Sequence, residues 1–149
     1  MSFSAVAVEQ NKGLVLDANI LVRAVLGKRV GDILERHHHH ADFFSPEICF
    51  EEALEHLPTI LKKRGVDPSE ALETLDHLQT LVHPVRVTSY RKLEKTARSR
   101  IRSRDEDDWP VLALALSLNL PIWTEDQDLF GVGIATWTTD RIELYFEDV

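Results

Sequence analysis

Short apolar segments that alternate with amphipathic helices constrain the fold of this chain more than any other feature. Residues 14–16, 42–44, 85–87, 121–123 and 132–135 have the length and character of buried strands, and helical spacing of apolar residues fills most of the intervals. Strands that alternate with helices form a parallel sheet covered on both faces, and their crossovers are right-handed. We therefore predict an α/β fold, a three-layer α/β/α sandwich around a central parallel sheet of four to five strands.

Capping residues and apolar periodicity delimit the predicted helices. Ser45 with Pro46, and Asp67 with Pro68, are typical helix starts, in which a capping side chain precedes a first-turn proline. The helices are expected at residues 20–26, 31–36, 46–61, 67–81, 90–104 and 109–119, and an amphipathic tail follows from Thr139. The helix at 109–119 is apolar on almost all sides. It is therefore either fully buried or half of a dimer interface, and we favour the dimer.

The length of 149 residues fits a single domain, predicted over residues 1–149 with residues 1–12 as a loosely ordered lead-in. No apolar run reaches the roughly 18–20 residues that a membrane span requires. The first residues also lack the basic flank and apolar centre of a secretion signal. The single cysteine, Cys49, agrees with a reducing compartment and is predicted to be a core residue. We expect a cytoplasmic protein with no membrane partner.

Acidic residues are placed along the chain so that the predicted fold brings them together. Asp17 follows the first strand, Asp126 follows the fourth, and Asp108 begins a helix whose amino end lies at the same edge of the sheet. Glu51 and Glu52 lie in the first turns of the helix after the second strand. Each aspartate also stands where a helix N-cap belongs, which is the more common role for a single aspartate. Together, however, clustered carboxylates repel one another unless a cation neutralises them.

The predicted cluster has the ligand chemistry of a hard divalent cation. Oxygen ligands without a cysteine partner favour Mg²⁺ or Mn²⁺ over zinc or copper, and such a site suits hydrolysis of phosphodiester bonds. An aspartate-dependent phosphatase is one alternative, since Asp17 ends a first strand, but that chemistry normally uses a second aspartate where this chain has Asn19. A non-catalytic binding module with the same fold is the other alternative.

Four motifs of this chain resemble those of the PIN-domain ribonucleases. They are LDANIL at residues 16–21, a serine followed six positions later by a glutamate at 45–51, DWPVLALA at 108–115, and PIWTED at 121–126. The resemblance extends over roughly residues 15–138. It implies a PIN-like parallel sheet, a site for Mg²⁺ or Mn²⁺, and cleavage of single-stranded RNA. Many members of the family are toxins of toxin–antitoxin pairs and are often dimeric, so the resemblance also implies an antitoxin protein and a second copy of the chain as partners.

The resemblance assigns roles to particular residues. The expected catalytic residues and metal ligands are Asp17, Glu51, Asp108 and Asp126. The expected supporting residues are Asn19, Thr124, Asp105, Asp128 and Glu52. Spacing alone selects Glu51 over Glu52 and Glu55. Glu125 departs from the family pattern, because many relatives carry a basic residue at that position.

A basic segment offsets the acidic total of the chain. Eight basic residues and one acid, Glu94, lie between Arg86 and Arg104, a local balance of +7 in a chain whose net charge is −8. Such segregation is typical of a basic strip beside an acidic centre, although a solvated helix face is the alternative. Phosphate contacts by such a strip supply affinity for nucleic acid. The RNA-binding residues predicted here are Arg91, Lys95, Arg98, Arg102 and Arg104.

Histidine and tryptophan side chains are assigned mainly to structure. The four consecutive histidines at residues 37–40 are predicted to be an exposed loop before the second strand, rather than a nickel or zinc site, because no acid or cysteine accompanies them at ligand spacing. Trp109 and Trp137 could stack on bases. Trp123 lies within a predicted strand and is assigned to the core.

Overall fold

The first strand is the centre of the sheet, because no polar side chain interrupts its apolar run. In the computed structural model, which describes residues 12–101 and 105–147, Leu14, Val15 and Leu16 are fully buried in β1 (Lys12–Leu16). Continuous apolar strands of this kind are typical of parallel sheets covered by helices on both faces. Lys12, predicted to belong to a loose lead-in, pairs with Ala41 and is part of the sheet. The rest of that lead-in, residues 1–11, lies outside the described residues.

Five strands form one parallel sheet in the order β3-β2-β1-β4-β5. The other strands are β2 (Ala41–Pro46), β3 (Val82–Val85), β4 (Ile122–Trp123) and β5 (Thr136–Trp137). The helices are α1 (Ala18–Leu26), α2 (Arg29–His37), α3 (Glu47–Lys63), α4 (Pro68–Leu78), α5 (Glu94–Ile101), α6 (Trp109–Leu118) and α7 (Ile142–Phe146).

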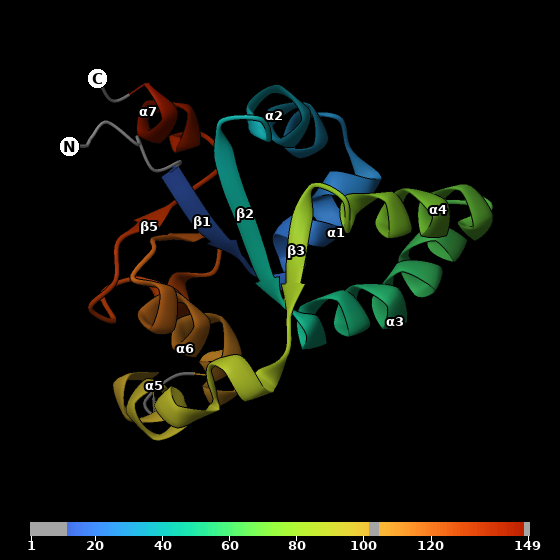
Figure 1. Ribbon diagram of the computed structural model, residues 1–149. Coiled ribbons are helices and arrows are strands. Elements are labelled where there is room, and N and C mark those ends of the chain that lie inside the picture. Colours follow the sequence, from blue (N-terminus) through green and yellow to red (C-terminus); the bar gives the residue numbers. More distant parts are fainter. Residues whose placement is uncertain (1–11, 102–104, 148–149) are drawn as a thin grey trace.

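The helices lie on both faces of the sheet. On one side α1, α3 and α4 pack against one another, and on the other side α6 packs on β1 and β2 with α5 outside it (Figure 1). The predicted three-layer α/β/α sandwich with a parallel sheet is therefore confirmed, with five strands.

The third strand begins earlier than predicted. β3 runs over Val82–Val85, and Val87 already belongs to a 3₁₀ turn (Val87–Ser89), so the prediction of residues 85–87 was wrong. Helix α4 ends at Leu78, which allows the chain to enter the sheet at Val82. Pro84 is tolerated in this strand because β3 lies at the edge of the sheet.

The fifth strand begins later than predicted. Residues 132–135 do not form a strand, because Gly131 and Gly133 have φ angles of 77° and 94°. Glycine adopts these turn conformations without steric cost, and they interrupt an extended run. The chain reaches the sheet afterwards, where Thr136 pairs with Ile122 and Trp137 with Trp123.

The second strand and the helix that follows it meet one residue later than the capping signal indicates. Ser45 is the buried fifth residue of β2, and its hydroxyl donates to the carbonyl oxygen of Leu16 at 2.7 Å instead of capping α3. Apolar spacing predicts a buried face of α3 that contains Phe50, Leu57 and Leu61, and these residues are buried together with Cys49 and Ala53. The same spacing also places Ile48 and Leu54 on that face, but they are 44% and 52% exposed. Ile48 is therefore available to line a cavity.

The apolar helix α6 is buried within the chain. Six consecutive residues, from Pro110 to Ala115, are buried, because the sheet covers one side of the helix and α5 covers another. Of the two interpretations of this helix, burial within the chain therefore holds for these six residues, whereas Leu118 at the end of the helix is 39% exposed. The basic helix also differs from its prediction, because α5 is confined to Glu94–Ile101 and a 3₁₀ turn (Arg91–Leu93) precedes it.

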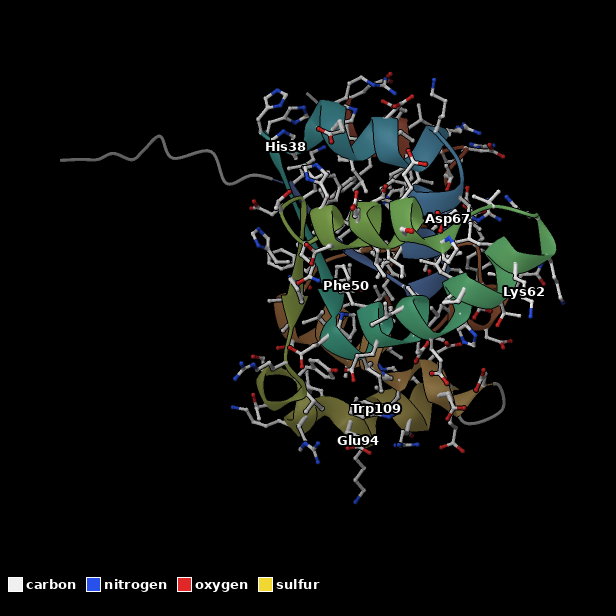
Figure 2. All side chains as sticks on the ribbon, turned by 90° about the vertical axis from the view of Figure 1, so that its right-hand side faces the viewer. His38, Phe50, Lys62, Asp67, Glu94 and Trp109 are labelled. Atoms are coloured by element: carbon white, nitrogen blue, oxygen red, sulfur yellow. The ribbon has the colours of Figure 1, made fainter. Side chains whose placement is uncertain are left out.

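The four histidines follow the end of α2. His38, His39 and His40 are exposed, as predicted, and Figure 2 shows His38 at the surface. His37 instead ends α2, where its ring stacks on Phe146 of α7 at 4.1 Å between centroids. Over the described ranges, no helix combines the length and the apolar character needed to cross a membrane.

Candidate metal centre

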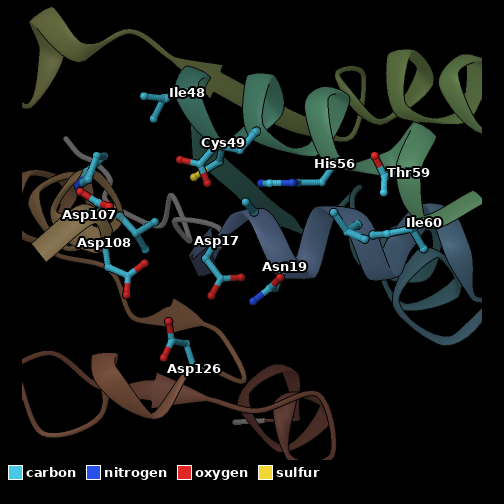
Figure 3. Close-up of a pocket in the computed structure, with 15 residues that line it drawn as sticks. Asp17, Asn19, Ile48, Cys49, His56, Thr59, Ile60, Asp107, Asp108 and Asp126 are labelled. Carbon is cyan, nitrogen blue, oxygen red and sulfur yellow. The ribbon is translucent and has the colours of Figure 1, made fainter. Parts of the chain in front are cut away.

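The order of the strands places the candidate site between β1 and β4. The sheet continues in opposite directions from this pair, so the loops after the two strands diverge and leave a crevice at their carboxyl ends, where ligands bind in open α/β sheets. Asp17 directly follows β1, and Asp126 follows β4 by three positions. Asp108 reaches the crevice from the amino end of α6. Figure 3 shows the carboxylates of these three residues facing a common space.

Asp17 is fixed through both of its carboxylate oxygens. Oδ1 accepts a hydrogen bond from the backbone N–H of Ile20 at 3.0 Å, which makes Asp17 the N-cap of α1. Oδ2 accepts a hydrogen bond from the Thr124 hydroxyl, which is also buried. Burial raises the pKa of Asp17 to about 6, although these hydrogen bonds oppose the shift. The cap role and a place at the site are therefore compatible for this residue.

Thr124 connects the two strand ends. Its hydroxyl donates to Asp17 and accepts from the backbone N–H of Asp126 at 2.9 Å. The Asp126 carboxylate in turn accepts from the backbone N–H of Asp128 at 2.9 Å, which begins a short 3₁₀ turn (Gln127–Leu129). One hydroxyl thus sets the relative positions of the two aspartates.

Asp108 differs from the other two aspartates because its side chain caps no helix. It precedes α6 without a side-chain capping hydrogen bond. Among the described residues, its Oδ2 atom is the only buried side-chain nitrogen or oxygen without a hydrogen-bond partner. Burial raises the pKa of Asp108 to about 8, and the neighbouring carboxyl groups of Asp126, Asp105 and Asp17 add to the shift. This carboxyl group therefore requires either a proton or a nearby cation.

The donors around Asp108 suit a hard divalent cation. Carboxylate oxygens of Asp108, Asp126 and Asp128 lie within 4.8 Å of one another. Asp17 lies outside that close group but lines the same cavity, which has a volume of about 440 Å³. No lysine or arginine appears among the described residues that line it. Oxygen donors, a carboxylate oxygen without a partner and uncompensated negative charge fit Mg²⁺ or Mn²⁺.

Of the neighbouring glutamates on α3, Glu52 is the one that lines the cavity of the metal centre. It lines the cavity of Asp17, Asp108 and Asp126, whereas Glu51 is exposed and lines a neighbouring cavity with Arg91. The two side chains point to different cavities because successive helical residues are turned by about 100°, and the assignment of Glu51 from spacing stays a prediction. Glu52 shares its face of α3 with Ile48 and His56, four positions away on either side. Burial raises the pKa of Glu52.

The supporting residues are distributed unequally. Asn19 lines the cavity, and Thr124 fixes Asp17 as described above. Asp105 is exposed, accepts a hydrogen bond from the backbone N–H of Asp107 at 3.0 Å and does not line the cavity. Asp107 and His56 line it and were not among the predicted residues. Two sequence features could have identified these residues. Asp107 belongs to the acidic run before α6, and His56 follows Glu52 by four positions on the same helix.

Buried side chains near the site have structural roles. Cys49 lines the cavity but is only 4% exposed, and burial raises the pKa of its thiol, which disfavours a thiolate nucleophile. Trp123 is fully buried, and its indole N–H donates to the Thr139 hydroxyl at 3.0 Å. The predicted core positions of these two residues are confirmed.

The predicted basic strip is partly neutralised by its own surroundings. The Arg98 guanidinium forms ion pairs with Glu94 at 2.8 Å and Glu106 at 3.8 Å, and it lies 5.2 Å from the centre of the Trp109 ring. Arg100 donates to the carbonyl oxygen of Val132 at 3.2 Å. Arg91 and Lys95 are exposed. The other two predicted RNA contacts, Arg102 and Arg104, lie outside the described residues.

Comparison with known proteins adds family evidence to this geometry. The family model described as PIN domain matches residues 15–147 of the chain. VapBC2 from Rickettsia felis, solved bound to a DNA fragment from their promoter, is 13% identical, with 85% of this chain and 98% of that chain covered and a TM-score of 0.62. PAE2754 from Pyrobaculum aerophilum is 16% identical, with 91% and 89% covered and a TM-score of 0.69. These two structures share the fold. No curated protein matches the chain.

Proposed function

The chain belongs to the PIN-domain family, and on this premise we propose that it is a divalent-metal-dependent endoribonuclease that hydrolyses phosphodiester bonds of single-stranded RNA. The observation that carries the proposal is the buried Asp108 oxygen, which has no partner among the described residues and faces a cavity that also exposes Asp17 and Asp126. Desolvated carboxylates of this kind are costly to a folded protein unless a cation neutralises them. A structural role alone does not account for that cost.

The residues of the site divide the work of binding and positioning. Asp108, Asp126 and Asp17 supply the carboxylates that would hold Mg²⁺ or Mn²⁺, with Asp128 and Glu52 beside them. The bound metal supplies an activated water and neutralises charge on the phosphate. Thr124 keeps Asp17 oriented toward the cavity, because both Asp17 oxygens are already hydrogen-bonded. Asn19 and His56 offer hydrogen-bond donors to a phosphate or sugar that enters the cavity.

We also propose that the chain is the toxin of a toxin–antitoxin pair. The Rickettsia felis structure, a VapBC2 complex bound to promoter DNA, is the relative that supports this role, together with the family match. An antitoxin protein would then be a partner of the chain. A homodimer also stays a prediction from the family resemblance. Its interface must be sought outside Pro110–Ala115 of α6, because these residues are buried within the chain.

A cleavage assay with a matched pair of variants tests the nuclease proposal. We expect the purified protein to cleave single-stranded RNA when Mn²⁺ or Mg²⁺ is present and to stop when the metal is chelated. Asp17→Asn should abolish cleavage and leave the fold intact, because asparagine also caps helices. Asp32→Asn, which alters an exposed aspartate of α2 outside the cavity, is the control and should remain active.

The outcomes separate the alternatives. Cleavage that persists unchanged in Asp17→Asn would contradict the proposed site. A protein that binds divalent metal and RNA without cleaving it would be a binding module. Release of inorganic phosphate from a phosphomonoester, without cleavage of RNA, would indicate a phosphatase.

A further inference from the structure

One face of helix α1 leads away from the metal centre into a second cavity. Asn19 and Val22 line the metal cavity, and Arg23 and Leu26 line the next one. These four residues are spaced at i, i+3, i+4 and i+7, so they form one continuous stripe on the helix. The two cavities therefore lie next to each other along α1.

Helix α3 forms the opposite wall in the same way. Glu52, His56 and Ile60 line the metal cavity, and Arg64 at the end of the helix lines the second cavity. Each follows the last by four positions, which again gives a single stripe. Helices α1 and α3 pack against each other, and Figure 3 shows His56, Thr59 and Ile60 on α3 opposite Asn19 on α1. The two cavities are also adjacent at the loop after β4, where Asp126 lines the metal cavity and the preceding residue, Glu125, lines the second cavity.

The second cavity, here the cationic pocket, is lined by four basic residues and two acids. The basic residues are Arg23, Lys28, Arg29 and Arg64, and the acids are Glu125 and Asp140. Its volume is about 530 Å³.

The acids of the cationic pocket are already engaged. Asp140 pairs with Arg29 at 2.8 Å, and Glu125 accepts a hydrogen bond from the backbone N–H of Thr139 at 2.6 Å. Within the described part of the chain, no ion pair involves Arg23, Lys28 or Arg64. Three exposed cations therefore face the pocket, with one hydrogen-bonded carboxylate to offset them.

We infer that the RNA strand runs along α1 and α3 from the metal cavity to the cationic pocket, with the scissile phosphate at the metal centre and the phosphates of neighbouring nucleotides in the cationic pocket. The inference rests on the proposed nuclease function and adds to it the residues that bind the strand: Arg23, Lys28 and Arg64. Cations that follow a backbone give affinity without sequence preference. Val22 and Ile60 lie between the two ends and offer apolar surface to a base or sugar.

A binding measurement in a non-cleaving background tests this path. In Asp17→Asn protein, fluorescence anisotropy is measured with labelled single-stranded RNA of about ten nucleotides, within the range that single-strand sites span. We expect the added pair Arg23→Gln and Arg64→Gln to weaken binding about tenfold. We also expect it to reduce the slope of log affinity against log salt by about 1.4, since each phosphate contact in a single strand contributes about 0.7.

The matched control removes the same charge from the end of α3. Lys62→Gln with Lys63→Gln changes two exposed lysines that do not line the cationic pocket, and it should leave affinity and slope nearly unchanged. A dinucleotide is too short to reach from the metal centre into the pocket, so its binding should not respond to the Arg23 and Arg64 substitutions. Equal affinities of the two double variants for the longer strand would overturn the inference. So would equal weakening of the dinucleotide.

Three outcomes distinguish this inference from the proposed nuclease function and from a different ligand in the cationic pocket. Wild-type protein that cleaves RNA, but whose arginine variant binds normally in the Asp17→Asn background, would contradict the path and leave the nuclease intact. Protein that does not cleave but loses strand binding in the arginine variant would support the path and contradict the nuclease. A polyglutamate peptide that depends on Arg23 and Arg64, while RNA does not, would assign the pocket to an acidic protein segment and overturn the RNA path.

Discussion

The metal cavity and the cationic pocket, which are the acidic end and the cationic end of the proposed RNA path, carry opposite charges in different environments. At the acidic end, Asp17 is 5% exposed, and burial raises the pKa values of Asp17 and Asp108. At the cationic end, Arg23 and Arg64 are exposed to solvent. A desolvated charge interacts strongly with a nearby ion and is costly when alone, whereas a solvated charge attracts weakly and is screened by salt. Substitutions at the acidic end should therefore have the larger effects, on both activity and stability.

The largest effect is expected from Asp108→Asn. It should lower metal-dependent RNA cleavage by at least about a hundredfold, because it removes a charge that stabilises the transition state through the bound metal. The same change should raise the melting temperature of the metal-free protein at pH 8, since it replaces a buried carboxylate with a neutral group of the same shape. Cleavage assays and thermal melts in chelator measure the two effects.

The pH dependence of the melting temperature of the metal-free protein tests whether ionisation of the Asp108 carboxyl group lowers the stability. The pKa of Asp108 is raised to about 8 in the folded protein, compared with about 3.9 in an unfolded chain. The stability linked to its proton is fully present below pH 4 and is lost as pH rises toward 8. The melting temperature of the wild type should therefore fall between pH 5 and 8, and Asp108→Asn should flatten that fall. Equal slopes for the two proteins would contradict a buried, ionising Asp108.

A smaller effect at the acidic end distinguishes two neighbouring glutamates. Glu52→Gln should reduce cleavage about tenfold at limiting metal, because groups beside metal ligands typically change metal affinity or activity ten- to a hundredfold. Glu51→Gln has the same chemistry on a different face of α3, and it should behave like the wild type. Titration of activity with Mn²⁺ measures both variants. The reverse ranking would show that the spacing within the family motif identifies the glutamate better than the cavity does.

The smallest effect is expected at the exposed basic residues of the segment 91–95. Arg91→Gln with Lys95→Gln should weaken binding of single-stranded RNA by about threefold at most, because isolated exposed charges contribute about 0–1 kcal/mol. The measurement is the anisotropy assay in the Asp17→Asn background, and the Arg23 and Arg64 variant is the reference. A loss larger than that of the reference would place the main phosphate contacts near α5 and reverse the comparison between the two basic regions.

The arrangement of the aspartates follows from features that a sequence shows directly. Asp17 and Asp126 each stand at the end of an apolar strand, and parallel strands bring their carboxyl ends to one edge. The structure places both there. It separates Glu51 from Glu52 because the start of α3 depends on where β2 ends, and Ser45 continues the strand through its bond to Leu16. A shift of one residue in a helix start changes which side chain faces the cavity.

The cationic pocket could not be read from the sequence. Its basic residues come from α1, the start of α2 and the end of α3, segments that are separated along the chain and brought together only by the fold. The dense basic run from Arg86 to Arg104 predicts an RNA-binding surface instead, although Arg98 within it forms ion pairs with two glutamates. The density of charge along a chain does not show which charges lack a partner in the folded protein. Here the packing of α1 against α3 brings the basic residues of the cationic pocket together.

The hydroxyl of Thr124 couples the pairing of β1 with β4 to the relative positions of the Asp17 and Asp126 carboxylates. The hydroxyl donates a hydrogen bond to Asp17, at the end of β1, and accepts one from the backbone N–H of Asp126, just beyond β4. Any sliding of β4 along β1 therefore breaks the bond from Thr124 to Asp17 and moves Asp126, which is bonded to the same hydroxyl, away from Asp17. Amide exchange at Val15, whose N–H donates to the Pro121 carbonyl across this seam at 3.0 Å, should therefore report the loss of the site's geometry.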